Sequence, residues 1–379
     1  MIDTLSGVTH TDVLIVAGNS RSLIANRGDL IREMQARGLQ VAVAVPRADY
    51  LPQTESLNVD IHLVDMARTS TNPTADLAYL LALCGLMQQL RPRVVFSYTA
   101  KPVIYGSLAA KLAKVPGRYA MVTGLGHAYT TNSAKTRAVR RVMNVLYRAG
   151  VAACRKVFFQ NPDDVAQFSA SGILRDGGKV VRTNGSGVDT TRFPVRPLPT
   201  GNPVFLFIGR LLTEKGIAEF VEAAAAVKAA WPQARFVAVG PHDPSLPHAV
   251  DAATLREWEA DGAVEFVGGV KDVRPWLAEC SVFVLPSYRE GTPRSVLEAM
   301  STGRPVITTD APGCRETVTD GVNGFLVPPR AAKPLADTMT RFLEEPQLLP
   351  EMAAASRRIA EEKYEVTKVN RVILEAMGL

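Results

Sequence analysis

Short apolar segments alternate with helical segments along the whole chain, and this alternation limits the possible folds more than any other feature. One set precedes a proline-rich stretch at residues 193–199, and a second set follows it. The predicted strands lie near residues 13–16, 41–45, 94–97, 120–123, 157–160 and 180–183, and then near 203–208, 236–239, 264–267, 282–285, 306–308 and 324–327. Strand–helix alternation of this kind predicts parallel sheets with helices on both faces. We therefore expect an α/β protein with two doubly wound, Rossmann-like domains.

The chain is long enough for two such domains, since 379 residues with 47% hydrophobic content can fill two cores. The proline-rich stretch marks the boundary, so the first domain is expected at residues 1–195. Ligands bind beyond the carboxyl ends of the strands in doubly wound sheets. We therefore expect a binding site in a cleft between the two domains.

One loop of the second set carries a pattern suited to phosphate and hydroxyl groups. An apolar strand leads into Glu290, Gly291 and Thr292, and Pro293 then takes the first position of a helix that contains Glu298. The free N–H groups at a helix start attract phosphate. A carboxylate accepts hydrogen bonds from hydroxyl groups. The combination indicates a sugar nucleotide.

A second loop offers two cations. The strand at 203–208 runs into Gly209 and Arg210, and Lys215 and Gly216 come directly before the next helix. Two cations held at a strand end beside a helix start can neutralise a diphosphate without a metal. Such a pattern alone also fits ordinary surface residues, and the loop with Glu290 in the same domain favours the diphosphate site.

Four segments of the second domain are FIGRLLTEKGI, VEFVGGVKDV, PSYREGTPRSVLEAMSTGRPVITTDAPGCRETV and NGFLVPP. They cover nearly the whole domain, and in their order and spacing they resemble the family 4 retaining glycosyltransferases of the two-domain GT-B fold. The resemblance implies that Arg210 and Lys215 hold the diphosphate of a nucleotide sugar. It also implies that Glu298 binds the ribose, that Glu290 contacts the donor sugar, and that the base lies near residues 268–271.

The family resemblance thus yields a complete set of predicted donor-site residues and domain limits. The catalytic residues are Arg210, Lys215 and Glu290, and the donor-binding residues are Gly209, Gly268, Val270, Lys271, Gly291, Thr292, Pro293, Val296 and Glu298. In the family a C-terminal helix crosses back to the first domain, which implies the same for residues 361–379. Residues 196–360 then form the donor domain, and residues 1–195 the acceptor domain.

The segments FSYTAKPVIYGSLAAKLAKVP, MVTGLGHAYT and NGSGVDTTRF lie in the first domain. They resemble bacterial transferases that extend a sugar on undecaprenyl diphosphate, including α-1,3-N-acetylgalactosaminyltransferases. This implies a UDP-linked N-acetylhexosamine as donor and a polyprenol-diphosphate-linked sugar as acceptor, in surface polysaccharide or glycan assembly. The candidate acceptor residues are Lys101, Gly124, Gly126 and His127. Related chains often have an aromatic or small residue where His127 stands, so both a structural position and a place in the cleft stay open for it.

The residues also limit the reaction chemistry. Glu290 and Glu298 are eight positions apart and cannot face each other across a glycosidic bond, as the paired carboxylates of a hydrolase do. The chain has no Asp-x-Asp motif and its cysteines and histidines are scattered, so we expect no metal and no other cofactor. The family implies retention by front-face displacement, in which the departing diphosphate accepts the proton of the acceptor hydroxyl.

Charge is distributed unevenly along the chain. Residues 1–195 hold 23 Lys and Arg against 13 Asp and Glu, whereas residues 196–379 hold 20 against 24, in agreement with the total of +6. Residues 77–162 contain 13 basic side chains and no acidic one, and residues 134–156 combine helical spacing with five arginines and two lysines. This favours an anionic membrane surface as partner, although an ordinary solvated helix would show a similar pattern. Lacking a signal peptide or a long apolar run, the chain is expected to be cytoplasmic and peripheral on the inner face of the membrane.

Other functions fit less well. A nicotinamide oxidoreductase would show G-x-G-x-x-G after the first strand, but residues 18–23 contain one glycine. A nucleic-acid partner is not expected, because the basic residues lack interleaved aromatic residues. The remaining alternatives are a family member with another nucleotide sugar and acceptor, and a non-hydrolysing UDP-sugar epimerase. The sequence does not predict an oligomeric state.

Overall fold

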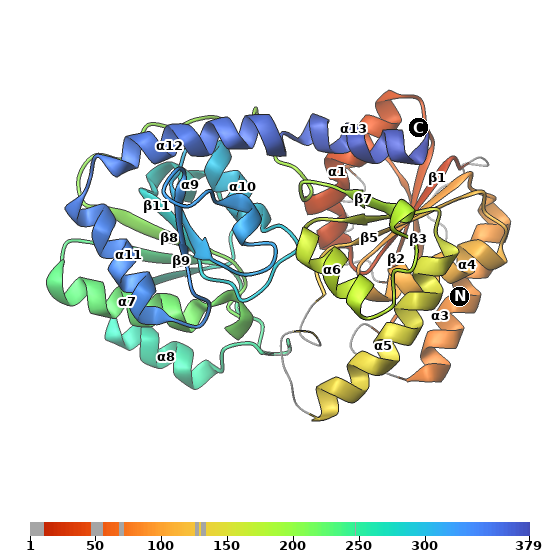
Figure 1. The fold of residues 1–379 in the computed structure, drawn as a ribbon, viewed down its shortest axis with the longest axis horizontal. Coiled ribbons are helices and arrows are strands. Elements are labelled where there is room, and N and C mark those ends of the chain that lie inside the picture. The colour runs from red at the N-terminus through yellow and green to blue at the C-terminus, as the bar shows by residue number, and fades with distance from the viewer. Residues whose placement is uncertain (1–10, 47–55, 68–71, 126–128, 130–133, 247) are drawn as a thin grey trace. The chain divides into compact units, whose positions relative to one another are not determined.

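The computed structural model describes residues 11–46, 56–67, 72–125, 129, 134–246 and 248–379, and the chain divides into two compact units. Unit 1 comprises Met1–Ser186 and Val369–Leu379, and unit 2 comprises Gly187–Lys368. Each unit has one parallel sheet with helices on both faces (Figure 1). The predicted α/β fold with two doubly wound domains is therefore confirmed.

The sheet of unit 1 has seven strands in the order β3-β2-β1-β4-β5-β6-β7. They are β1 (Val13–Ala17), β2 (Val41–Val45), β3 (Asp60–Leu63), β4 (Val94–Tyr98), β5 (Gly117–Val122), β6 (Lys156–Phe159) and β7 (Val180–Arg182). Strand β3 is missing from the predicted strands, because its sequence Asp-Ile-His-Leu contains only two apolar residues. It lies at the edge of the sheet, where it needs less apolar surface than a central strand.

The helices of unit 1 form two separate cores with the sheet. Residues of β1 alternate between them, because successive side chains of a strand point to opposite faces. One core includes α1 (Ser20–Ala36) and α13 (Val366–Met377). The other includes α3 (Pro73–Leu90), α4 (Ser107–Leu112), α5 (Ala134–Ala153) and α6 (Pro162–Ala170), with a π-helix, Pro102–Gly106, before α4.

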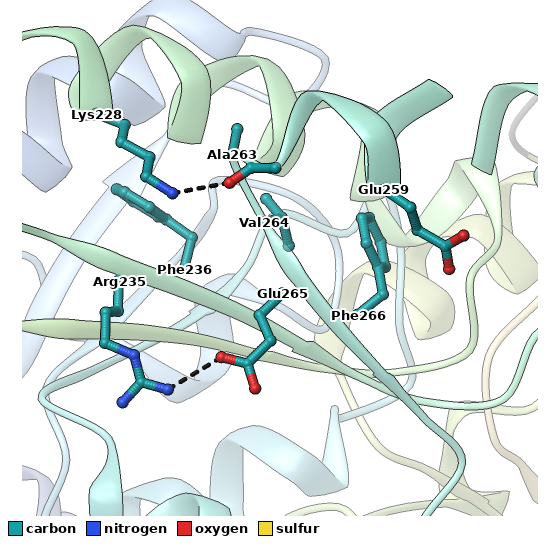
Figure 2. A pocket seen from close by; sticks show the side chains of 9 residues that line it. Lys228, Arg235, Phe236, Glu259, Ala263, Val264, Glu265 and Phe266 are labelled. Atoms are coloured by element: carbon teal, nitrogen blue, oxygen red, sulfur yellow. Dashed lines mark hydrogen bonds and ion pairs between the residues drawn. The ribbon is translucent and has the colours of Figure 1, made fainter. Parts of the chain in front are cut away.

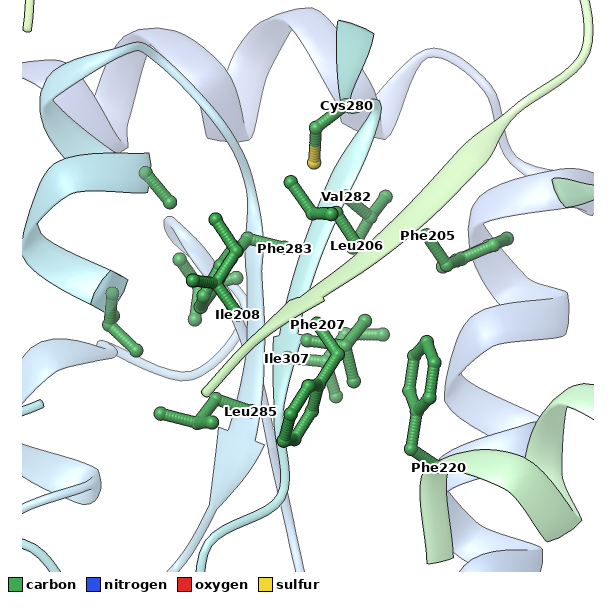
Figure 3. Close-up of a cluster of buried hydrophobic side chains, with 14 of the residues drawn as sticks. Phe205, Leu206, Phe207, Ile208, Phe220, Cys280, Val282, Phe283, Leu285 and Ile307 are labelled. Atoms are coloured by element: carbon green, nitrogen blue, oxygen red, sulfur yellow. The ribbon is translucent and has the colours of Figure 1, made fainter. Parts of the chain in front are cut away.

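The sheet of unit 2 has six strands in the order β10-β9-β8-β11-β12-β13. They are β8 (Val204–Ile208), β9 (Arg235–Val239), β10 (Glu265–Gly268), β11 (Val282–Leu285), β12 (Val306–Thr309) and β13 (Gly324–Val327). The helices are α7 (Ile217–Ala230), α8 (Ala252–Asp261), α9 (Arg274–Glu279), α10 (Arg294–Ser301), α11 (Ala332–Glu344) and α12 (Leu348–Ile359). The central strands β8 and β11 are buried along their whole length, and Figure 3 shows their side chains packed with Phe220 of α7.

The proline-rich stretch belongs to unit 2 and does not form the boundary. The side chain of Phe193 lies in the core of unit 2, and its carbonyl accepts a hydrogen bond from Ser301 Oγ at 2.7 Å. The buried guanidinium of Arg304 donates to the carbonyls of Arg196 and Pro197 at 3.1 and 2.9 Å. The boundary predicted between residues 195 and 196 is therefore too late, since the units divide after Ser186.

The C-terminal residues return to unit 1. Tyr364, in a π-helix at Ala360–Tyr364, is buried in the core of unit 2, whereas Val369 and Ile373 are buried in a core of unit 1. The chain therefore leaves unit 2 after Lys368, and not at residue 360 as the sequence predicts. None of the helices in the described parts of the chain is long and apolar enough to cross a membrane.

Candidate functional site

The predicted catalytic residues Arg210, Lys215 and Glu290 lie where the strand order of unit 2 reverses, between β8 and β11. Gly209 and Arg210 follow β8 directly, and a 3₁₀-helix, Thr213–Lys215, comes next. Glu290 lies on the loop that follows β11. Because β8 and β11 are parallel neighbours, both loops leave the same edge of the sheet. Ligands of doubly wound proteins bind at such a reversal.

Lys215 and Glu290 form an ion pair between Nζ and Oε1. Their side chains are only 19% and 14% exposed, so the pair is largely shielded from water. The sequence predicts separate partners for them, a diphosphate for Lys215 and a sugar for Glu290, and the structure brings both residues to one place. Arg210 is exposed at the start of the β8 loop, where its guanidinium is accessible.

The two loops are in close backbone contact. Gly216 has φ of 74°, and a Cβ atom there would lie closer than 3.0 Å to the carbonyl oxygen of Pro286. The N–H of Tyr288 donates to the carbonyl of Glu214 at 2.9 Å. Lys215 therefore lies on a segment that is fixed directly to the loop of Glu290.

Tyr288 adds a side-chain link that the sequence does not reveal. Its hydroxyl donates to Glu219 Oε1, on the first turn of α7, at 2.5 Å. The guanidinium carbon of Arg330 lies 4.5 Å from the centre of the tyrosine ring. Burial, together with the hydrogen bond to Glu219, raises the pKa of Tyr288, so the hydroxyl stays protonated and donates. The only sequence signal for this residue is its place two positions before Glu290.

Gly313, after β12, supports the loop of Glu290 from the other side. Its φ is 77°, and a Cβ atom there would lie closer than 3.0 Å to the carbonyl oxygens of both Glu290 and Gly291. The N–H of Glu290 donates to the carbonyl of Pro312 at 2.9 Å. The sequence does not indicate this contact, although Gly313 is part of the longest segment that resembles the family.

Helix α10 begins one residue later than predicted. Pro293 is the extended residue before the helix, with ψ of 112°, and Arg294 is the first helical residue. Glu298 Oε1 accepts a hydrogen bond from Arg294 Nε at 2.8 Å. Burial raises the pKa of Glu298, and the charge of Arg294 opposes the rise. The side chain of Val296 lies fully buried in the core, and its predicted contact with a donor stays a prediction.

The region predicted for the base lies at the ends of β9 and β10. The N–H of Gly240 donates to the carbonyl of Gly268 at 2.9 Å, and a Cβ atom on Gly240 would lie closer than 3.0 Å to the carbonyl oxygen of Gly209. The three loops after β8, β9 and β10 therefore join through backbone contacts. Val270 is half-buried and Lys271 is exposed just beyond Gly268.

In unit 1, the two acceptor candidates that the structure describes lie at the carboxyl edge of the sheet. Lys101 follows β4 and forms an ion pair with Asp76, which also accepts a hydrogen bond from the hydroxyl of Tyr105 at 2.8 Å. Gly124 follows β5 and has φ of 114°. Gly126 and His127 lie outside the described residues.

A surface pocket of about 370 Å³ lies at the opposite, amino-terminal edge of the unit 2 sheet (Figure 2). Three of its four charged residues pair within the lining, because Arg235 pairs with Glu265 at 3.0 Å and Lys228 donates to the carbonyl of Gly262 at 2.7 Å. The length of β9 separates this pocket from the loops described above, so it is not part of the candidate site. Within the described residues, no three His, Cys, Asp or Glu side chains are grouped to hold a metal; metal independence stays a prediction.

Comparison with known proteins decides the family. Residues 202–345 match the domain family described as glycosyl transferases group 1, and residues 27–185 match the glycosyl transferase 4-like domain. The chain is also 31% identical to a Campylobacter jejuni N,N'-diacetylbacillosaminyl-diphospho-undecaprenol α-1,3-N-acetylgalactosaminyltransferase, over 85% of this chain and 86% of the relative. The chain belongs to the family 4 glycosyltransferases. The resemblance predicted from the sequence is therefore confirmed.

Two further proteins are similar to this family 4 glycosyltransferase. An Escherichia coli UDP-Gal:α-D-GlcNAc-diphosphoundecaprenol α-1,3-galactosyltransferase is 28% identical over 66% of each chain. The crystal structure of Anabaena HepE in complex with UDP superposes with a TM-score of 0.78, at 18% identity, over 97% of this chain and all of that one. At this identity the structural match shows a shared fold, which is GT-B.

Proposed function

We propose that this glycosyltransferase moves an N-acetylhexosamine from a UDP-sugar to a saccharide carried on undecaprenyl diphosphate, in the assembly of bacterial surface polysaccharide or glycan. The ion pair of Lys215 and Glu290 at the strand reversal of unit 2 is the observation that carries the proposal. The names of the C. jejuni and E. coli relatives, both with diphospho-undecaprenol acceptors, support it, as does UDP in the Anabaena structure. The E. coli relative makes galactose the second candidate donor sugar.

The ion pair suits a site that must accept an anion and hydroxyl groups together. Without donor, Glu290 balances the charge of Lys215 in a largely buried place. The diphosphate of a donor offers Lys215 and the exposed Arg210 a stronger anionic partner. Glu290 is then available to accept hydrogen bonds from the hydroxyls of the sugar. Donor binding thus replaces the ion pair by contacts of Lys215 with the diphosphate and of Glu290 with the sugar hydroxyls. Neither of the two largely buried charges is then left without a partner.

Glu298 is suited to bind the ribose of the donor nucleotide. Its carboxylate is held by Arg294 one helical turn earlier, and as an acceptor it matches the two ribose hydroxyls. Because burial raises its pKa, contact with donor hydroxyls stabilises an ionised form that is otherwise poorly solvated.

The proposed chemistry is front-face displacement without a metal and with retention. The bond from the anomeric carbon to the diphosphate oxygen breaks, and the acceptor hydroxyl attacks from the same face and gives its proton to that oxygen. Lys215 and Arg210 stabilise the negative charge that develops on the diphosphate. Glu290 positions the donor sugar and does not act as a nucleophile. Because the acceptor is anchored in lipid, we place the enzyme on the inner face of the cytoplasmic membrane as a peripheral protein.

A donor screen tests the proposal. The purified chain is incubated with UDP-N-acetylgalactosamine, UDP-N-acetylglucosamine, UDP-galactose or UDP-glucose and a polyprenol-diphosphate-linked sugar, with and without EDTA. We expect an α-linked product from an N-acetylhexosamine donor, formed equally well with EDTA. A β-linked product would reject retention, and loss of activity with EDTA would reject metal independence. Interconversion of UDP-sugars without acceptor would instead identify an epimerase.

A further inference from the structure

We propose that the outer surface of α3, α4 and α5 in unit 1 docks on an anionic membrane surface, with aliphatic side chains entering the interface and basic side chains contacting lipid headgroups. The three helices are direct neighbours, because α4 contacts both α3 and α5. All three cover the same face of the sheet of unit 1. We call their outward-facing side the docking face.

Helix α3 contributes an apolar surface without charge. From residue 77 to its end at residue 90 it contains no charged side chain. Tyr79, Leu83 and Leu86 point into the core, whereas Leu77 and Leu81, one turn apart, are 54% and 60% exposed on the opposite side. A helix that is apolar on all sides normally lies buried within protein or lipid. The outer side of α3 is therefore suited to a partner that offers an apolar environment.

Helix α5 continues the surface with an apolar stripe beside basic residues. The exposed residues at helical spacing are Ala138, Val142, Val145, Ala149 and Ala152. Val142 and Val145 are each more than half exposed, and the side chains of Arg137 and Arg141 are exposed next to them. Met143 and Leu146 pack against the core, so only part of the apolar residues of α5 faces outward.

Helix α4 joins the two. Its last residue, Leu112, is more than half exposed between the exposed cations Lys111 and Lys114. Of the eight large hydrophobic side chains exposed among the described residues, five lie on these helices, so the docking face is the main apolar surface. The five are Leu77, Leu81, Leu112, Val142 and Val145.

The charges identify the partner. Residues 77–162 contain 13 basic and no acidic side chains, so no carboxylate of this segment opposes an anionic surface. Aliphatic side chains flanked by Lys and Arg match the boundary between acyl chains and anionic headgroups. A second copy of the docking face would bring like charges together. A nucleic acid would engage the cations but would leave the leucines of α3 in water. An anionic bilayer satisfies both features.

The inference rests on the proposed function only for its purpose, which is to bring unit 1 to a lipid-linked acceptor; binding itself requires neither donor nor acceptor. The test is therefore flotation of the full chain with vesicles of phosphatidylethanolamine and phosphatidylglycerol, compared with vesicles of phosphatidylcholine alone. We expect binding to the anionic vesicles only. The variant Leu77→Gln/Leu81→Gln removes the apolar contact, and Lys111→Gln/Arg141→Gln removes two cations. Each should lower the partition coefficient about tenfold or more.

Matched controls remove the same groups elsewhere. Val195→Gln/Val322→Gln replaces two exposed aliphatic residues of unit 2, and Lys333→Gln/Arg358→Gln removes two of its exposed cations. Both should bind vesicles like the wild type. Circular dichroism melting shows whether each variant is folded. Equal binding to neutral vesicles, or equal losses in test and control variants, would overturn the proposal. So would a dimer that only the Leu77→Gln/Leu81→Gln variant dissociates, since the face would then join two copies. Vesicle binding without transferase activity would instead reject the proposed function and leave the docking face intact.

Discussion

Replacing Lys215 by alanine tests the central role of the ion pair. Loss of one charged group that stabilises a developing anion costs about 3–4 kcal/mol of transition-state stabilisation, and 1.36 kcal/mol corresponds to about a tenfold change in rate. The change also leaves Glu290, only 14% exposed, as an unpaired anion beside the diphosphate. Charges about 4 Å apart at an effective dielectric constant of about 20 interact by about 4 kcal/mol. Both effects act in the same direction, so Lys215→Ala should lower kcat at least about a hundredfold.

The assay measures UDP release and lipid-linked product with the donor that the wild type uses. The melting temperature should fall by only about 5 °C or less, because the chain keeps both cores and Glu290 can be rehydrated. Lys215→Arg keeps the charge and should retain more activity than Lys215→Ala. Adding Glu290→Gln to Lys215→Ala removes the unpaired anion and should restore part of the donor affinity. Turnover of Lys215→Ala within about tenfold of the wild type, in a folded protein, would refute the assignment of the diphosphate site.

Three further predictions concern the groups around the ion pair. Gly313→Ala should abolish most transfer, because a Cβ atom would displace the backbone of Glu290, whereas Gly321→Ala, at an equally positive φ but in open space, should remain active. Tyr288→Phe should lower kcat about tenfold, since the loop of Glu290 loses its side-chain link to Glu219 at the start of α7, and calorimetry should show a folded protein. Burial raises the folded-state pKa of Glu298, so the ionised carboxylate destabilises the folded protein at pH values above the usual titration range of a carboxylate. This destabilisation disappears as the pH falls and the carboxylate becomes protonated. Glu298→Gln should therefore raise the donor KM without lowering the melting temperature at neutral pH, and the melting temperatures of variant and wild type should converge on acidification; a constant difference would reject the assigned burial.

The sequence predicts the residues of the candidate site better than their contacts. Arg210, Lys215 and Glu290 follow apolar strands directly, so their place at the carboxyl edge follows from the alternation of strands and helices. The ion pair between Lys215 and Glu290 cannot be predicted in this way, because β8 and β11 are distant in sequence and become neighbours only through the strand order. The contacts of Gly313 with the loop of Glu290, and of Tyr288 with Glu219, cannot be predicted for a related reason, since each joins segments that are distant along the chain.

The predicted limits of elements and domains depend on weaker signals. Proline-rich stretches often separate domains, but carbonyl groups held by the buried Arg304 fix this one to unit 2. No local pattern around residues 193–199 predicts an arginine more than a hundred positions later. Val296 is named among the donor-binding residues, and its complete burial in the core of unit 2 could not be read from the sequence around helix α10 alone.

The return of the C-terminal helix to unit 1 has a consequence for how the protein is made. Val369, Ile373, Leu374 and Met377 complete one face of the unit 1 sheet, and the hydroxyl of Tyr119 on β5 donates to the carbonyl of Met377 at 3.0 Å. During synthesis, helix α1 alone covers that face of the sheet until the ribosome has translated all of unit 2. Unit 2 can fold as soon as its own residues have emerged. The half that is translated first is therefore expected to reach its final stability last, and the apolar residues that α13 will cover stay in contact with water in the meantime.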